Sequence, residues 1–421
     1  MKREKKYLYM VAALLCIIGT YSCKQEFFPP EVGAPIPIDQ DNTVYPALLE
    51  ALPETGYETF KAIWNRSEVK DLIATGEYGK ETFTYFVPQD DVLAAAGYTP
   101  VTIQGMSRAR LDTLVRMHVM RSKIVIAGLP VGTDLSLNSL LQIQEFPVSS
   151  EENYIFRHYL HKDAEGLIHN GDPMGIVNEL PVNNGSAVLV DRLLNLPDKQ
   201  MIDIIKGDDR FSLFLEAMDL NIAMRVNFHI VNWYTDGSFM HRALYEYPYI
   251  FDASTVPESY RPDFVSSTLF LPTNEAFHQV GIHTVEDVIA LSQRTDIGDI
   301  WGNQKTPLEN VLHLHTLKGD AVIFTNNDYN RPDYPVYVEV SNAPNPSSNP
   351  IFFAHDFLNP QFSQSRALIP YSFNIRANDN KVTVQAVGSA YEPATISETI
   401  MTWQGPVHIV NRLIIEEGVE L

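Results

Sequence analysis

The chain has 421 residues, with 31 lysines and arginines against 52 aspartates and glutamates, and its formal net charge is −21 at pH 7. A surface this acidic repels phosphate backbones, so nucleic acid is excluded as an expected partner. The hydrophobic fraction of 45% is typical of a globular protein rather than a disordered one. The length suffices for about two or three domains with cores of their own.

The N-terminus has the pattern of an export signal. Four basic residues precede an apolar run at 8–18, which is too short to span a bilayer as a helix. The small residue Ser22 before Cys23 resembles a bacterial lipobox, whose cysteine carries the lipid. We therefore expect 1–22 to be a lipoprotein signal peptide. An ordinary signal peptide, or a membrane anchor with an incidental cysteine, is the alternative.

The expected anchor also limits the chemistry of the chain. Only Cys16 and Cys23 are present, and processing would leave the acylated Cys23 alone. The mature chain would then have no disulfide, thiol nucleophile or cysteine-rich metal site. Residues 23–41 carry the lipidated cysteine and a proline-rich tether. The charged stretch 24–26 resembles signals that send Bacteroidetes-type lipoproteins to the cell exterior, so we expect an outer-membrane lipoprotein exposed at the cell surface.

Beyond the tether, a first motif occurs twice. Residues 84–93 parallel residues 268–277, and each segment reads as a short β-run that a proline stops before a helix begins. Polar residues follow each proline, where a side-chain oxygen can accept an orphan backbone N–H of a helix N-terminus. The residues concerned are Pro88 and Asp90 in the first copy, and Pro272, Thr273 and Asn274 in the second.

Two further motifs follow in the same order in each half. Residues 111–119 parallel 308–316, with leucines at helical spacing and a histidine near the end. Residues 186–194 parallel 406–414, and both are β-rich runs of valine, isoleucine and leucine. The histidines are His118 and His315, and the matching polar residues of the closing runs are Asp191 and Asn411.

These three repeated motifs are similar to those of the fasciclin (FAS1) family. Residues 268–277 are close to its first motif, 405–414 look like its second, and His315 takes the central position between them. The first copy departs further, with Gln89 where threonine is usual and Met117 before the histidine. The resemblance implies an α+β fold of two tandem FAS1-like domains, each a β-sandwich wedge packed with short helices.

The motif spacings set the expected domain bounds. The repeats place domain 1 at 42–197 and domain 2 at 198–418. Wider spacings in the second copy give it inserts near 226–261 and 325–395. Variable segments on a common scaffold are where specific function is usually found.

The first insert holds the candidate contacts for a ligand or partner. They are Trp233, Tyr234, Tyr245, Tyr247 and Tyr249. The three alternating tyrosines would share one face of a strand, where they could stack on sugar rings or form a protein hot spot. The other interpretation, that these rings cover the domain core or an interface, agrees better with the usual burial of aromatic side chains.

No catalytic, metal or cofactor site stands out in the sequence. Enzyme signatures such as G-x-S-x-G, H-E-x-x-H and G-x-G-x-x-G are absent. His118 and His315 could contact a ligand, but the resemblance favours buried histidines bonded to a neighbouring loop. Arg192 and Arg412 in the closing motifs are expected to pair structurally near the sheet edge.

The resemblance implies adhesion and matrix contact rather than catalysis. Similar two-domain lipoproteins look like accessories of nutrient uptake, so a polysaccharide is one expected partner and an envelope or matrix protein the other. The membrane would be reached through the lipid anchor only. A structural role in assembling another envelope protein is the alternative. A glycan-active enzyme is less favoured, because no pair of carboxylates is singled out.

Overall fold

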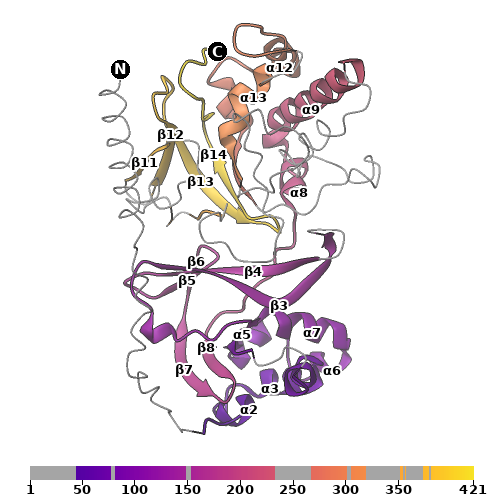
Figure 1. Ribbon diagram of the computed structural model, residues 1–421, viewed down its shortest axis with the longest axis vertical. Helices are drawn as coiled ribbons and strands as arrows, with labels where there is room; N and C mark the ends of the chain where they lie inside the picture. The colour runs from indigo at the N-terminus through magenta and orange to yellow at the C-terminus, as the bar shows by residue number, and fades with distance from the viewer. Residues whose placement is uncertain are drawn as a thin grey trace, which may run out of the picture. The chain divides into compact units, whose positions relative to one another are not determined.

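The computed structural model describes most of the chain after its N-terminal segment (Figure 1). The described residues are 44–76, 81–147, 153–232, 267–300, 305–318, 351–353, 356, 373–378 and 381–421. Residues from Pro46 to Leu421 form one compact unit. The segments expected to be the signal peptide and the tether, Cys23 and the five aromatic candidates lie outside the described residues. Within the described part, no helix has the length and apolar character needed to cross a membrane.

The first half is built around an eight-stranded sheet with the strand order β6-β5-β4-β3-β2-β1-β8-β7. Its strands are β1 Phe83–Pro88, β2 Val119–Met120, β3 Thr133–Pro147, β4 Asn153–Lys162, β5 Leu167–His169, β6 Asp172–Met174, β7 Ile176–Val182 and β8 Gly185–Val190. Strands β1 and β8 pair in parallel, and the other pairs are antiparallel. Every residue of β1 and β8 is buried, as expected of strands covered on both faces.

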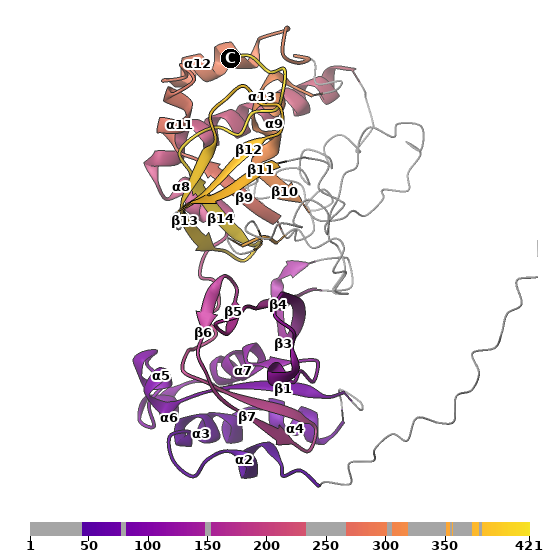
Figure 2. The same cartoon turned by 90° about the vertical axis from the view of Figure 1, so that its left-hand side faces the viewer.

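The helices of the first half cover one face of this sheet. They are α2 Leu48–Ala51, α3 Glu58–Arg66, α4 Val69–Ala74, α5 Asp90–Ala95, α6 Thr102–Gly105 and α7 Arg108–Met117. The 3₁₀ turn η1 Ile126–Gly128 contributes Ile126 to the core on the opposite face. Figure 2 shows helices α3 and α7 beside strand β1. Tyr85 of β1 packs with Phe60 and Leu111 of the helices. The next residue, Phe86, points to the other face and packs with Phe156 of β4. Side chains alternate along a strand, so β1 joins the two cores.

The second half has a six-stranded sheet with the order β10-β9-β14-β13-β12-β11. Its strands are β9 Ser267–Pro272, β10 Thr316–Lys318, β11 Phe373–Asn378, β12 Lys381–Ala386, β13 Ala394–Met401 and β14 Pro406–Val410. Its helices are α8 Met201–Lys206, α9 Ser212–Asn232, α11 Asn274–His278, α12 Val285–Ser292 and α13 Pro307–Leu312, with the 3₁₀ turns η2 Asp209–Phe211 and η4 His313–His315. Strands β11 and β12 fall within the insert expected at 325–395.

The central strands of the two halves correspond one to one. The order β2-β1-β8-β7 matches β10-β9-β14-β13, and β9 pairs in parallel with β14 as β1 does with β8. A glycine begins each closing run, Gly185 with φ +157° and Gly405 with φ +144°. A Cβ there would lie 1.8 Å from the Phe83 carbonyl oxygen or 2.2 Å from that of Ser267. Both positions therefore require glycine, and the predicted α+β fold with a tandem repeat is confirmed.

Candidate functional site

The histidine of the first half joins the end of helix α7 to the segment after β8. His118 is the C-cap residue of α7 and is almost completely buried. Its Nε2 accepts a hydrogen bond from the Leu194 backbone N–H at 3.2 Å, and its Nδ1 lies 2.8 Å from the Leu114 carbonyl oxygen. Because Nε2 accepts, the ring is neutral and Nδ1 carries the proton that it donates to Leu114.

The second half repeats the bond to Nε2, but the Nδ1 atom has a partner on strand β9 instead of in its own helix. The Nε2 atom of His315 accepts from the Ile414 N–H at 2.9 Å, and its Nδ1 donates to the Phe270 carbonyl at 2.7 Å. Leu194 and Ile414 are each the third residue after the polar position of the closing motif, Asp191 or Asn411. Burial lowers the pKa of both His118 and His315 to about 4. Each histidine therefore holds a helix end to the closing strand as a neutral ring.

Asp191 and Asn411 fasten the closing strands to their neighbours. The Asp191 backbone N–H donates to the Gly175 carbonyl oxygen at 3.1 Å. Asn411 accepts from the Thr395 N–H through its Oδ1 at 2.7 Å and returns a backbone bond to the Thr395 carbonyl at 3.3 Å. Asn411 thus fixes the backbone through its side chain as well, whereas Asp191 does so through its backbone N–H.

The polar residues after the strand-ending prolines Pro88 and Pro272 cap a different helix from the one expected. The carboxylate of Asp90 accepts from the N–H groups of Glu58 and Thr59 at 3.1 and 2.8 Å, at the start of α3. The following helix α5 receives no side-chain cap from its own N-cap residue. The expectation that these residues cap their own helix is therefore wrong for Asp90, because tertiary packing brings an earlier helix within reach.

Asn274 occupies the equivalent place in the second half. Its Oδ1 accepts from the Leu213 N–H at 3.0 Å, and its Nδ2 donates to the Asp209 carbonyl oxygen at 2.9 Å. Leu213 lies in the first turn of α9, so Asn274 caps an earlier helix as Asp90 does. Thr273 is the N-cap residue of α11, but its side chain makes no capping bond, and its backbone N–H donates to Val410 at 3.2 Å.

These caps give a first prediction. Asp90→Ala is expected to lower the free energy of unfolding by about 1–2 kcal/mol, because two N–H groups of α3 lose their acceptor. Asp90→Asn should cost clearly less, since an amide oxygen performs the same task at Asn274. Urea denaturation followed by circular dichroism measures both variants. Equal losses for the two would show that the carboxylate does not act through these hydrogen bonds.

A second pair of histidines lies on two neighbouring strands of the first half, with His158 on β4 and His169 at the end of β5. His158 Nδ1 and His169 Nε2 are 2.7 Å apart, and one of these nitrogens donates to the other. Burial lowers the pKa of His158 well below its ordinary value, and the neighbouring His169 lowers it further. Burial, with a smaller effect of His118, lowers the pKa of His169 to about 3. Among the described residues, no three His, Cys, Asp or Glu side chains gather so that they could hold a metal ion.

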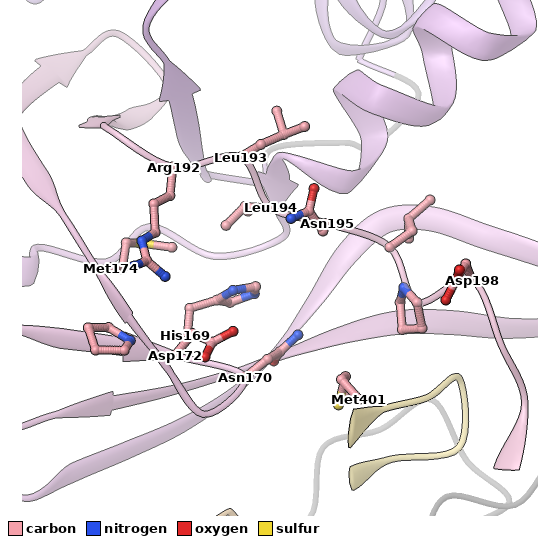
Figure 3. A pocket seen from close by; sticks show the side chains of 13 residues that line it. His169, Asn170, Asp172, Met174, Arg192, Leu193, Leu194, Asn195, Asp198 and Met401 are labelled. Carbon is pink, nitrogen blue, oxygen red and sulfur yellow. The ribbon is translucent and has the colours of Figure 1, made fainter. Parts of the chain in front are cut away.

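One side of His169 borders a cavity of about 300 Å³ (Figure 3). The β5–β6 hairpin contributes 169–170 and 172–174, the segment after β8 contributes 192–198, and Met401 of β13 completes the lining. Arg192, Asp172, Asn195 and Asp198 supply charged and amide groups (Figure 3). Small-molecule sites are of this size or larger and combine apolar walls with a few polar groups. The cavity is therefore the candidate binding site of the described chain.

The sequence pointed to only one residue of this cavity, and it gave that residue another role. Arg192 was expected to pair structurally, but neither Arg192 nor Arg412 has a side-chain partner within the described residues. The feature of the sequence that could have pointed to this cavity is the Asn170-Gly171 turn, where both residues have positive φ, at 49° and 89°. It indicates a tight hairpin, but it does not show that the hairpin meets the segment after β8.

Comparison with known proteins adds to this geometry. Residues 55–197 match the family model of the Fasciclin domain. Among solved structures, the chain is similar to a FAS1 domain pair from the insect cell adhesion molecule fasciclin I, with 9% sequence identity and a TM-score of 0.26. That match covers 86% of this chain and 98% of the other. No curated protein matches the chain.

Proposed function

We propose that this chain is a fasciclin-type cell-surface binding and adhesion protein rather than an enzyme, because its residues 55–197 match the Fasciclin domain. Fasciclin domains are associated with adhesion and binding. In both halves the motif residues are engaged in holding the backbone, as the bonds of His118 and His315 illustrate. Specific contacts then fall to the cavity and to the segments that differ between the halves.

The proposed mechanism is presentation of a folded binding unit at the outer surface. Cys23 carries the lipid that fixes the chain to the outer membrane, and the tether up to residue 41 gives it reach. The ligand is a glycan, held as an accessory to nutrient capture. The sequence of the first insert supports this, because its alternating tyrosines would share one face of a strand and could stack on sugar rings, with Trp233 and Tyr247 as the candidates to test.

Calorimetric titration of the soluble chain, residues 24–421, against host and plant polysaccharides tests this function. Saturable heat is expected from at least one polysaccharide, with weaker binding by Trp233→Ala and Tyr247→Ala. Tyr98→Ala, in the first half, is the aromatic control and should bind like the unchanged protein. If no polysaccharide gives heat, the glycan ligand is refuted. A pull-down of envelope proteins would then test the alternative role as an assembly partner.

A glycan-active enzyme is the less favoured alternative. Asp172 and Asp198 both line the cavity, as a pair of catalytic carboxyl groups would. The general acid of such a pair needs a shielded, apolar surrounding that keeps it protonated near neutral pH. Asp172 and Asp198 are both exposed to solvent, so their surroundings favour binding of a sugar over its hydrolysis.

A further inference from the structure

The cavity beside the β5–β6 hairpin is lined by polar groups that the protein itself leaves unpaired. The side chains of Arg192, Asp172, Asn195 and Asp198 make no hydrogen bond or ion pair with any other residue in the described part of the chain. They nevertheless line one cavity, open to solvent, from two separate segments (Figure 3). A guanidinium and two carboxylates around one cavity that do not pair together remain free for a ligand that both donates and accepts.

We propose that this cavity binds a single sugar residue, an inference that rests on the proposed glycan-binding function and gives it a second site. The lining carries one positive charge, on Arg192, and two negative charges, on Asp172 and Asp198. The carboxylates repel an anionic ligand, and the guanidinium repels a cationic one. A neutral polyol meets neither obstacle, because each hydroxyl donates to a carboxylate and accepts from a guanidinium or amide.

The remaining walls suit the carbon skeleton of a sugar ring. Met174, Leu193 and Met401 line the cavity with apolar atoms that can contact the C–H groups of a pyranose. A volume of about 300 Å³ lies at the small end of ligand sites, so it suits one residue rather than an extended chain. Because the four polar side chains are exposed at the rim, a terminal or branching sugar has access from solvent.

The cavity walls are held in place before any ligand arrives. The segment carrying Arg192 and Asn195 is fixed by the bond from the Leu194 N–H to His118. On the hairpin, the Asn170 Oδ1 atom accepts from the Tyr159 N–H at 3.0 Å, and the Asn170 N–H donates to the Tyr159 carbonyl at 2.9 Å. Fixed walls reduce the ordering cost of binding, which matters most for a small polar ligand.

Titration of the full chain with free glucose, galactose, mannose and N-acetylglucosamine tests the proposal, with saturation-transfer NMR as the readout. At least one of these sugars is expected to bind saturably. Arg192→Ala should lower the affinity for that sugar about 10- to 100-fold, as expected for the loss of a hydrogen bond to a charged group. Asn195→Trp should abolish binding by filling the cavity with an indole ring. Arg376→Ala, an exposed arginine on β11, is the matched control and should bind normally.

Each contrary result has a separate meaning. Equal sugar affinity in Arg192→Ala, Asn195→Trp and the unchanged chain, all folded by circular dichroism, would refute the cavity as the site and leave the glycan-binding function standing. If none of the four sugars binds, the cavity proposal also fails. The polysaccharide titration then decides independently whether the chain binds glycans through the first insert.

Discussion

His118→Ala is expected to lower the free energy of unfolding by about 3 kcal/mol, the largest loss from a single substitution that we predict. The change removes the acceptor of the buried Leu194 N–H, and an unsatisfied buried donor costs about 1–3 kcal/mol. It also leaves a cavity where a fully buried ring had packed. Urea denaturation followed by circular dichroism measures the loss.

The second half provides both a replicate and a control for this result. His315→Ala should cost a similar amount, because His315 binds the Ile414 N–H in the same way. His278→Ala should have little effect, since this side chain is 36% exposed, pairs with Glu275 on the same helix and contacts only the ring of His283 besides. If His118→Ala cost no more than His278→Ala, the histidine would not be the fastening between helix end and closing strand.

Mild acid is expected to destabilise the protein steeply between pH 6.5 and pH 4. Burial lowers the pKa of His118, His315 and His408 to about 4, and burial with a smaller effect of His118 lowers that of His169 to about 3. In this window the unfolded chain binds protons that the folded chain refuses, so stability falls as the pH falls. The contribution of each ring is complete above pH 6.5 and is lost progressively toward its folded pKa.

The expected size of the acid effect follows from these pKa values. One pKa unit corresponds to about 1.4 kcal/mol, so a histidine lowered from 6.5 to about 4 contributes at most about 3.5 kcal/mol. Several such rings together should unfold the protein before pH 4 is reached, given ordinary domain stabilities of about 5–15 kcal/mol. Urea midpoints measured at pH 7.5, 6, 5 and 4.5 follow the loss.

Carboxylates act in a different pH range, which separates their effect from that of the histidines. Hydrogen bonds from Arg294 and from the backbone near Asp287 hold the pKa of Asp296 and of Asp287 below the usual value. Such groups stabilise the fold above the unfolded pKa, near 4, and lose that contribution only below it. A urea midpoint that stayed constant from pH 7 to pH 5 would therefore contradict the claim that the buried histidines are neutral in the folded protein.

Much of the fold could be predicted because its repeated motifs are local. The strand-proline-helix pattern at Pro88 and Pro272, the helix ending at His118 and the β-rich closing runs each depend on neighbours in the sequence. Two occurrences in the same order made the tandem repeat plain. The helices and strands that are indicated by the spacing of apolar residues and by the residues that end them are found where the sequence predicts them.

The contacts that cross the chain could not be predicted. Asp90 caps the first residues of α3, which lie more than 30 positions earlier in the chain, and only tertiary packing brings the two together. The cavity likewise combines the β5–β6 hairpin with the segment around Arg192. The candidate site chosen from sequence rested on the aromatic composition of the first insert, which lies outside the described residues. It stays a prediction for the titrations above.

The parallel pairing of β1 with β8 also governs the order in which the protein can form. Gly185 is about 100 residues further along the chain than its partner Phe83, and β9 and β14 are separated by a longer stretch still. The entropy of closing such a loop is lost before the two strands stabilise each other, so folding is slow relative to local helix formation. During synthesis, each half therefore remains an open, protease-sensitive chain until its closing strand has been made.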